Sequence, residues 1–126
     1  MCYNSNCRIE IKSCIDGAKS KISVDGKAVI SPSHRRFDYI LDGDECTLRV
    51  TDNEVVQVRR GEQNIKLTFR KGESGECFLE SGGFSGTFSV FTQDLQTSDN
   101  GRCFALLIVY TLGEQKTELN FSAKYK

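Results

Sequence analysis

The chain of 126 residues has few or none of the residues that many common protein functions need. It contains a single histidine, His34, no tryptophan and no C-x-x-C pair. One histidine without a cysteine partner at zinc-finger spacing makes no zinc site of a known pattern. The chain also has no serine–histidine–acid order and no H-x-x-x-H pattern. We therefore expect that the protein is not an enzyme and that it holds no cofactor.

Net charge and long apolar runs are absent as well. Seventeen basic and seventeen acidic residues cancel, whereas a general binder of nucleic acid or of membrane surfaces needs a basic footprint. No run approaches the roughly 20 apolar residues of a membrane span. Residues 1–8 lack the basic start and apolar core of a signal peptide. These features predict a cytoplasmic protein with no nucleic-acid partner and no membrane partner.

Six cysteines are present, and their even number would suggest three disulfides in an exported protein. Thiols in a reducing cytoplasm usually stay reduced, however. Several of the six lie in strand-like segments where a small apolar side chain packs well, so we expect reduced, structural thiols. Cys2 and Cys7 are the exceptions, because they lie in a terminal segment, residues 1–7, that we expect to be flexible. These two thiols are candidates for reactivity.

Short segments of alternating polarity fill most of the chain. The clearest is the segment in which Ile65, Leu67 and Phe69 alternate with polar residues. Residues 84–92 and 103–110 are rich in β-branched and aromatic residues and carry no charge. The second of these runs is apolar on both faces, as in a central strand whose two sides are both shielded. About nine or ten strands, joined mostly by hairpins, are predicted in this way.

Turn signals separate these segments. Asp16-Gly17, Asp25-Gly26 and Asp42-Gly43 are predicted to form tight turns, because Asp and Gly tolerate the positive φ of primed hairpin turns. Residues 93–97 allow at most one short turn of helix. No internal repeat or linker is visible, so residues 1–126 are expected to form one domain. Consecutive antiparallel strands with one apolar face close most simply as an up-and-down β-barrel of about eight to ten strands.

The second half of the chain resembles a known family. The run VRRGE at residues 58–62, LTF at residues 67–69, GFSGTFSVFTQDL at residues 83–95 and GRCFALLIVYTL at residues 101–112 together resemble the YwiB-like family of bacterial proteins of unknown function. The order and spacing of these pieces carry the resemblance, which extends over most of residues 20–125. It implies a small cytosolic domain with a lipocalin-like (calycin) β-barrel, and it supplies no catalytic residues. The secreted lipocalins have a tryptophan that this chain lacks, so their retinoid or odorant binding is not carried over.

Arg60 is the first candidate for a binding residue. Alternation places it on the face of Val56 and Val58, which we predict to point inward, beside Gly61. An inward arginine near a barrel end can hold an anionic ligand through its planar guanidinium group. It can equally close the barrel end, by capping backbone carbonyls or by stacking on Tyr110. Both roles are open at this point.

The other candidates are polar groups near strand ends. Tyr39, Tyr110 and Glu80 are predicted to line the mouth of a cavity, although each also fits an ordinary strand position with its polar end in water. The cluster at residues 34–36, His-Arg-Arg, is either a contact for a phosphate or an acidic partner, or a solvated loop.

The size of the barrel leads to two hypotheses of function. Barrels of this size either fill with side chains or hold one small ligand, and many large side chains are predicted to point inward: Phe37, Tyr39, Phe69, Phe88, Phe104, Tyr110 and Phe121. We expect a largely filled interior that binds a small apolar or anionic molecule at one mouth. The alternative is a protein-interaction or homodimerisation module with a filled barrel, because Ala105, Leu107 and Val109 form a second apolar face on the long strand.

Overall fold

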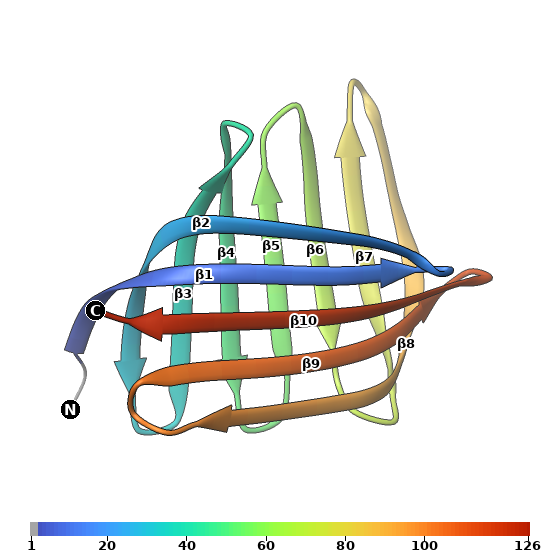
Figure 1. The fold of residues 1–126 in the computed structure, drawn as a ribbon. Helices are drawn as coiled ribbons and strands as arrows, with labels where there is room; N and C mark the ends of the chain where they lie inside the picture. Colours follow the sequence, from blue (N-terminus) through green and yellow to red (C-terminus); the bar gives the residue numbers. More distant parts are fainter. Residues whose placement is uncertain (1–2) are drawn as a thin grey trace.

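A computed structural model describes residues 3–126, which form one closed antiparallel barrel of ten strands (Figure 1). Each strand pairs with its neighbours in sequence, and β10 pairs with β1. The prediction of an all-β, up-and-down barrel is therefore confirmed. The strands are β1 (Tyr3–Ile15), β2 (Ala18–Ser31), β3 (His34–Leu41), β4 (Asp44–Thr51), β5 (Val55–Arg60), β6 (Gln63–Phe69), β7 (Ser74–Ser81), β8 (Phe84–Asp99), β9 (Cys103–Leu112) and β10 (Gln115–Tyr125).

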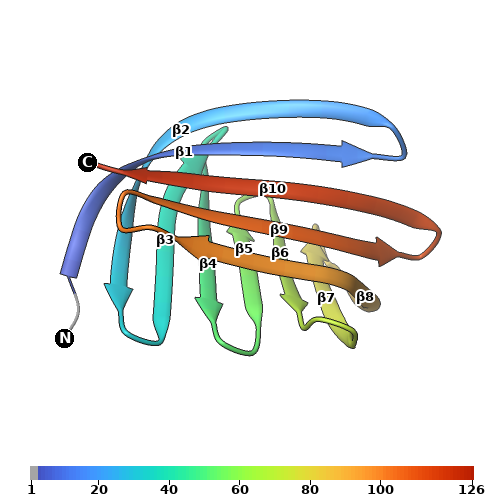
Figure 2. The same cartoon turned by 60° about the horizontal axis from the view of Figure 1, so that its bottom comes forward.

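The barrel has two layers whose strands cross (Figures 1 and 2). Strands β1, β9 and β10 lie in one layer and β3 to β7 in the other. The long strands β2 and β8 belong to both. Residues 18–30 of β2 pair with β1, and residues 26–31 also pair with β3. Residues 84–91 of β8 pair with β7, and residues 90–99 pair with β9. These two strands form the corners of the barrel.

The corner in β2 lies at Gly26, where the tight turn predicted at Asp25-Gly26 is wrong. The strand continues through this position, pairing with β1 on one side and with β3 on the other. A Cβ atom at Gly26 would lie 2.5 Å from Ile9 Cδ1 and 2.8 Å from the carbonyl oxygen of Asp38. Glycine is needed here because neighbouring strands approach closely, and no reversal of the chain is involved.

The corner in β8 is a β-bulge between Thr92 and Asp94. A bulge adds a residue to one strand and bends it, which directs β8 from the layer of β7 to the layer of β9. The short helical turn predicted for residues 93–97 is wrong, because this segment continues β8. No helix within residues 3–126 is long and apolar enough to cross a membrane.

Two hairpin turns have the predicted chemistry. Asp16 and Gly17 have φ values of 48° and 88°, and Asp42 and Gly43 have values of 51° and 83°. Two consecutive residues with positive φ are typical of primed turns, whose twist matches that of the flanking strands.

The N-terminal segment is a strand as far as the structure describes it. Residues 3–7, which we expected to be flexible, belong to β1 and pair with β2 from Tyr3 to Cys7. Cys7 is fully buried, and burial raises the pKa of its thiol, which opposes the reactivity proposed for it. The five cysteines within residues 3–126 are free thiols. Cys2 lies outside the described residues.

The core contains two groups of aromatic rings. Phe37 packs against Phe104 with ring centroids 5.0 Å apart and against Phe121 at 5.2 Å. Phe69 packs against Tyr110 at 4.8 Å. Each fully buried side chain of this size contributes about 1.5–3 kcal/mol through removal of apolar surface from water. The interior is therefore largely filled, as predicted.

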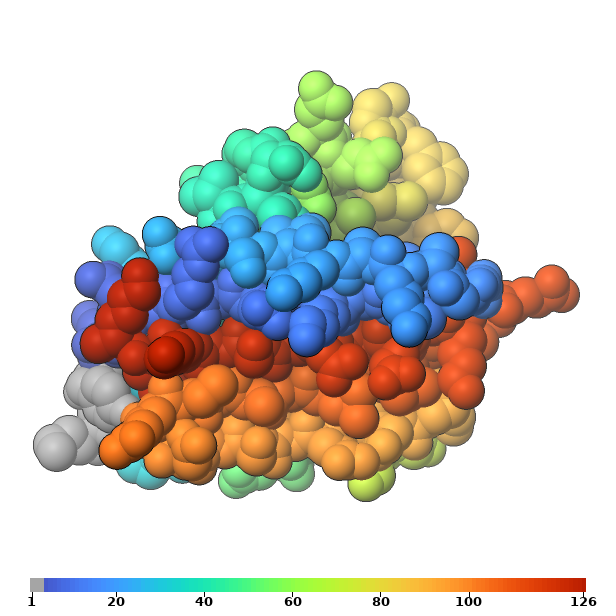
Figure 3. Space-filling view, in the orientation of Figure 1, coloured from blue at the N-terminus to red at the C-terminus, as the bar shows by residue number. Residues whose placement is uncertain are grey.

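The two ends of the barrel differ. In the space-filling view, the tips of the β3–β4, β5–β6 and β7–β8 hairpins project beyond the edge formed by β1 and β2 (Figure 3). At the opposite ends of these strands the inward residues Val50, Val55 and Phe69 are buried. Near the projecting tips, the inward residues Ile65 and Leu79 are only half-buried. The barrel therefore has a closed end and an open end.

Candidate functional site

An apolar cleft of about 980 Å³ occupies the open end. It lies between β6, β7 and β8 and the end of β9, and Ile65, Leu67, Leu79 and Leu112 contribute to its lining. Ile65 pairs with Leu79 and Leu67 pairs with Cys77, so these side chains share the inner face of the sheet. The four lining residues named are half-buried. The cleft therefore presents core-type side chains to solvent.

Two phenylalanines of β8 lie at this end of the barrel. Phe84 is 56% exposed and Phe88, which lines the cleft, is 44% exposed. Gly86 lies between them, and a Cβ atom there would be 3.3 Å from Phe84 Cζ and 3.4 Å from Phe88 Cε2. The two rings thus rest against the backbone at Gly86. They extend the apolar surface of the cleft to its rim.

Tyr110 brings a polar group to the cleft. Its ring packs on Phe69, and burial raises the pKa of its hydroxyl, while a hydrogen bond with Thr117 acts in the opposite direction. The hydroxyl is therefore neutral at ordinary pH and can donate or accept a hydrogen bond. Thr92 lies opposite Tyr110 in the register and is fully buried, and its Oγ1 has no hydrogen-bond partner among the residues that the structure describes.

A polar region adjoins the apolar cleft. Arg59 Nε donates a hydrogen bond to Asp44 Oδ2 at 2.7 Å. These two residues line a second cleft, of about 560 Å³, which shares Gln63 and Ile65 with the first. The hydrogen bond to Asp44 raises the pKa of Arg59 further. The inward arginine of β5 already has a carboxylate partner, so it attracts an additional anion weakly.

The prediction that Arg60 points inward is wrong. Val55 pairs with the buried Val50 and is itself buried, so the alternate residues Gln57 and Arg59 share its inner face. Arg60 is exposed on the outer face of the barrel. The inward arginine is its neighbour Arg59.

Two further predicted site residues lie away from the cleft. Tyr39 is buried in the core, 6.2 Å from Phe121 between ring centroids, and burial raises its pKa to about 12. Glu80 is exposed on the outer face, where it accepts a hydrogen bond from Asn64 Nδ2 at 3.0 Å. Of the four predicted residues, only Tyr110 lines the apolar cleft. Its contact with a ligand stays a prediction.

The second apolar face of β9 is narrow. Ala105 is exposed, and Leu107 and Val109 are half-buried. Leu107 is flanked by Gln96 on β8 and Asn120 on β10, both exposed and polar. The apolar stripe is thus one strand wide, and homodimerisation through it stays a prediction.

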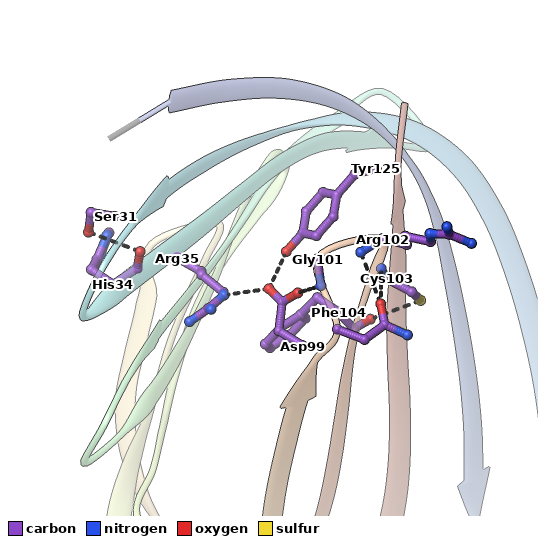
Figure 4. A network of polar contacts seen from close by, with 10 residues as sticks. Ser31, His34, Arg35, Asp99, Gly101, Arg102, Cys103, Phe104 and Tyr125 are labelled. Atoms are coloured by element: carbon purple, nitrogen blue, oxygen red, sulfur yellow. Dashed lines mark hydrogen bonds and ion pairs between the residues drawn. The ribbon is translucent and has the colours of Figure 1, made fainter. Parts of the chain in front are cut away.

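A polar network that was not predicted from the sequence joins β3, β8 and β10, away from the apolar cleft (Figure 4). Asp99 Oδ2 accepts hydrogen bonds from Arg35 Nε and from the Tyr125 hydroxyl, each at 2.8 Å, and Asp99 Oδ1 accepts one from the Gly101 N–H at 2.8 Å. The Arg35 guanidinium also lies 5.8 Å from the centroid of the Phe104 ring. β3 begins at His34 and residues 34–36 are half-buried, so the interpretation of this cluster as a solvated loop is wrong, and its contact with a phosphate or an acidic partner stays a prediction.

The network affects ionisation in opposite ways at its two acidic groups. Burial opposes the charge of Asp99, but hydrogen bonds from Gly101, Tyr125 and Arg35 prevail and hold its pKa below the ordinary value. Burial and the adjacent carboxylate raise the pKa of Tyr125. The hydrogen bonds of Asp99 thus connect β3, β8 and β10. Within residues 3–126, no three histidine, cysteine or carboxylate side chains gather in a way that would hold a metal ion.

The fold and the cleft define a class of small, closed up-and-down barrels with one filled end and one open apolar end. Within that class, the chain belongs to the family described as Domain of unknown function (DUF1934), whose profile matches residues 15–125. The crystal structure of ywiB protein from Bacillus subtilis is similar over 98% of this chain and 93% of that chain, with a TM-score of 0.83. The two sequences are 16% identical, so this similarity concerns the fold alone. No curated protein matches the chain. The resemblance to the YwiB-like family is confirmed.

Proposed function

We propose that the protein binds a small apolar molecule in the cleft at the open end of the barrel. The observation that carries the proposal is the exposure of core-type residues on the inner face of β6, β7 and β8, where Ile65, Leu67 and Leu79 are half-buried and Phe88 is 44% exposed. The cleft, at about 980 Å³, has the size of sites for small ligands, which span about 300–1,000 Å³. A ligand would remove this apolar surface from water.

The surroundings of the cleft favour an apolar ligand over an anionic one. The rings of Phe37, Phe104 and Phe121 pack against one another in the core, so the proposed ligand would lie at the open end and not among these rings. Its apolar body would lie against leucine and phenylalanine side chains. A polar end would reach the Tyr110 hydroxyl or solvent. An anionic group would compete with Asp44 for Arg59, which reduces its gain in binding free energy.

A fluorescent apolar probe tests the proposal. N-phenyl-1-naphthylamine should bind with saturable enhancement of its fluorescence. Leu79→Gln, which places an amide in the cleft, should weaken binding about tenfold, because loss of a leucine contact removes roughly 1–2 kcal/mol. Ile40→Gln is the matched control, because Ile40 is exposed on the outer face of β3. Circular dichroism and thermal unfolding would verify that both variants fold.

Two outcomes would reject the proposal. One is the absence of saturable binding to the wild-type protein, and the other is an equal loss of affinity in both variants. If the probe binds as expected, native mass spectrometry of protein purified without added ligand should reveal an apolar molecule that dissociates from Leu79→Gln more readily than from wild type.

A further inference from the structure

A second groove lies on the outer face of β3 to β6, on the side of the sheet opposite the core. Its volume is about 670 Å³. Val56 and Val58 of β5 are half-buried and form an apolar floor. Arg49 on β4, Arg60 on β5 and Lys66 on β6 line the groove around them and are exposed. The pairing of Arg49 with Val56 and of Lys66 with Val58 places each cation beside the valine floor.

Four Arg and Lys side chains line the groove, and three of them form no ion pair within the described residues. No salt bridge within residues 3–126 involves Arg49, Arg60 or Lys66. Arg49 lies directly opposite Arg36 of β3, and like charges at facing strand positions repel each other. Arg36 pairs with Asp38 at 3.1 Å, whereas Arg49 has no such compensation.

Two carboxylates, Asp38 and Glu54, also line the groove, and both already have partners. Asp38 accepts hydrogen bonds from Arg36 and from the Thr47 hydroxyl, at 3.1 Å and 3.0 Å. Glu54 pairs with Arg70 at 2.9 Å. Glu45 lies opposite Arg60 in the register but forms no ion pair with it. The groove therefore presents an excess of positive charge and hydrogen-bond donors over an apolar floor.

We propose that this groove binds an extended acidic peptide segment of a partner protein. Val56 and Val58 are alternate residues of one strand, so their side chains recur at the two-residue spacing of an extended peptide. Apolar side chains of the peptide would contact the valines, and its carboxylates would pair with Arg49, Arg60 and Lys66. Among the described residues, the lining of the groove contains one aromatic ring, the imidazole of His34, and no Phe or Tyr, so the bases of single-stranded nucleic acid would find little surface for stacking, whereas apolar peptide side chains fit the valine floor. The peptide is therefore the better fit.

Fluorescence anisotropy with labelled synthetic probes tests the assignment. The probes are a peptide of alternating Glu and Val, its counterpart with Lys in place of Glu, and an oligothymidine of equal charge. The test variant is Arg49→Gln/Arg60→Gln/Lys66→Gln. The matched control is Lys19→Gln/Lys116→Gln/Lys124→Gln, which changes the net charge equally at exposed positions of β2 and β10 that form no ion pair.

The acidic peptide should bind the wild-type protein, and the dissociation constant should rise with salt because exposed charges are screened. In the groove variant the dissociation constant of the acidic peptide should be about tenfold higher than in wild type, as expected for the loss of three exposed ion pairs. In the control variant it should stay within about twofold of the wild-type value. The Lys-containing peptide should not bind. Equal weakening in the groove variant and the control would overturn the proposal, as would failure of the acidic peptide to bind at low salt. Tighter binding of oligothymidine than of the peptide would also overturn it, in favour of a nucleic-acid surface.

Discussion

Replacing Asp99 by asparagine should destabilise the barrel through the network shown in Figure 4. Asp99 accepts hydrogen bonds from Arg35, Tyr125 and Gly101, and it thereby links β3 and β10 to the end of β8. The side chains of Asp99 and Arg35 are 14% and 28% exposed, so solvent screens their ion pair only partly. In Asp99→Asn, the guanidinium of Arg35 keeps its charge and loses its counterion.

The expected loss follows from the number and burial of these contacts. Hydrogen bonds to charged groups contribute about 1.5–3 kcal/mol each, and removal of one partner from a fully buried ion pair costs about 3–5 kcal/mol. Asparagine still accepts a hydrogen bond, and Arg35 retains some contact with water. We therefore expect a loss of about 2–3 kcal/mol, which in a domain of this size lowers Tm by roughly 8–12 °C.

The loss should depend on pH in a defined direction. The pKa of Asp99 is lower in the folded protein than in the unfolded chain, where it is about 4. The charged carboxylate therefore stabilises the fold fully above that unfolded-state pKa, and this contribution disappears as the pH falls through the folded-state pKa. The difference in unfolding free energy between wild type and Asp99→Asn should be complete at neutral pH and should shrink below about pH 4.

Urea unfolding followed by circular dichroism at a series of pH values would measure this difference. Asp25→Asn is the control, because Asp25 also contacts two cations, Arg8 and Lys126, but is 69% exposed. Its loss should be clearly smaller. An equal loss in both variants would refute the role assigned to burial. A difference that persists unchanged into strong acid would refute the role assigned to the charge.

Three further predictions concern single groups. Thr92→Val should stabilise the protein by about 1 kcal/mol, because it removes a buried hydroxyl that lacks a partner among the described residues; a lower urea midpoint would contradict this. Asp44→Asn should increase the affinity for an alkyl carboxylate relative to the alcohol of equal length, because Arg59 loses its counterion beside the cleft. Displacement of the fluorescent probe would measure the ratio of the two affinities. An unchanged ratio would show that Arg59 does not reach the ligand. Burial raises the pKa of the Cys46 and Cys77 thiols. Dithionitrobenzoate should therefore modify these thiols far more slowly in the folded protein than in urea, and the rate should rise with pH. Similar rates in the folded and unfolded protein would exclude their burial.

The orientation of a strand could be predicted where apolar residues stand only at every second position. Ile65, Leu67 and Phe69 alternate with polar residues, and the structure places all three on the inner face. Residues 55–60 contain valines on both faces of the strand, so alternation alone did not show which face points inward. The pairing of Val50 with Val55 decides the orientation, and it depends on the register between two strands. For this reason the inward arginine was misplaced by one residue.

The corners could not be predicted from local signals. Asp25-Gly26 has the same composition as the true turn at Asp16-Gly17. What distinguishes Gly26 is its close approach to Ile9 and Asp38, which belong to other strands. Such contacts appear only when the barrel is assembled. The bulge that bends β8 could not be predicted either, because the polar stretch around it carries no local signal of a bend.

The residues of the candidate site could be predicted only in part. A barrel of this size can be filled or can hold a small ligand, and the sequence left both open. Tyr110 was correctly predicted to point inward, and it lines the cleft. The exposure of Leu79 and Phe88 depends on where the hairpins project past the other layer, which no local pattern records. The pair of Arg35 and Asp99 joins residues 64 positions apart. Neither residue signals its partner in the sequence.

A tryptophan placed in the cleft would test the binding proposal most directly, because the natural chain has none. Phe88→Trp puts the only indole in the cleft, and Phe78→Trp puts it on the outer face at a similarly exposed position, 40% against 44%. Titration with a medium-chain alkanol should shift the emission of Phe88→Trp to shorter wavelength with saturation and leave that of Phe78→Trp unchanged. No shift in Phe88→Trp, or the same shift in both variants, would contradict a specific apolar site at the open end of the barrel.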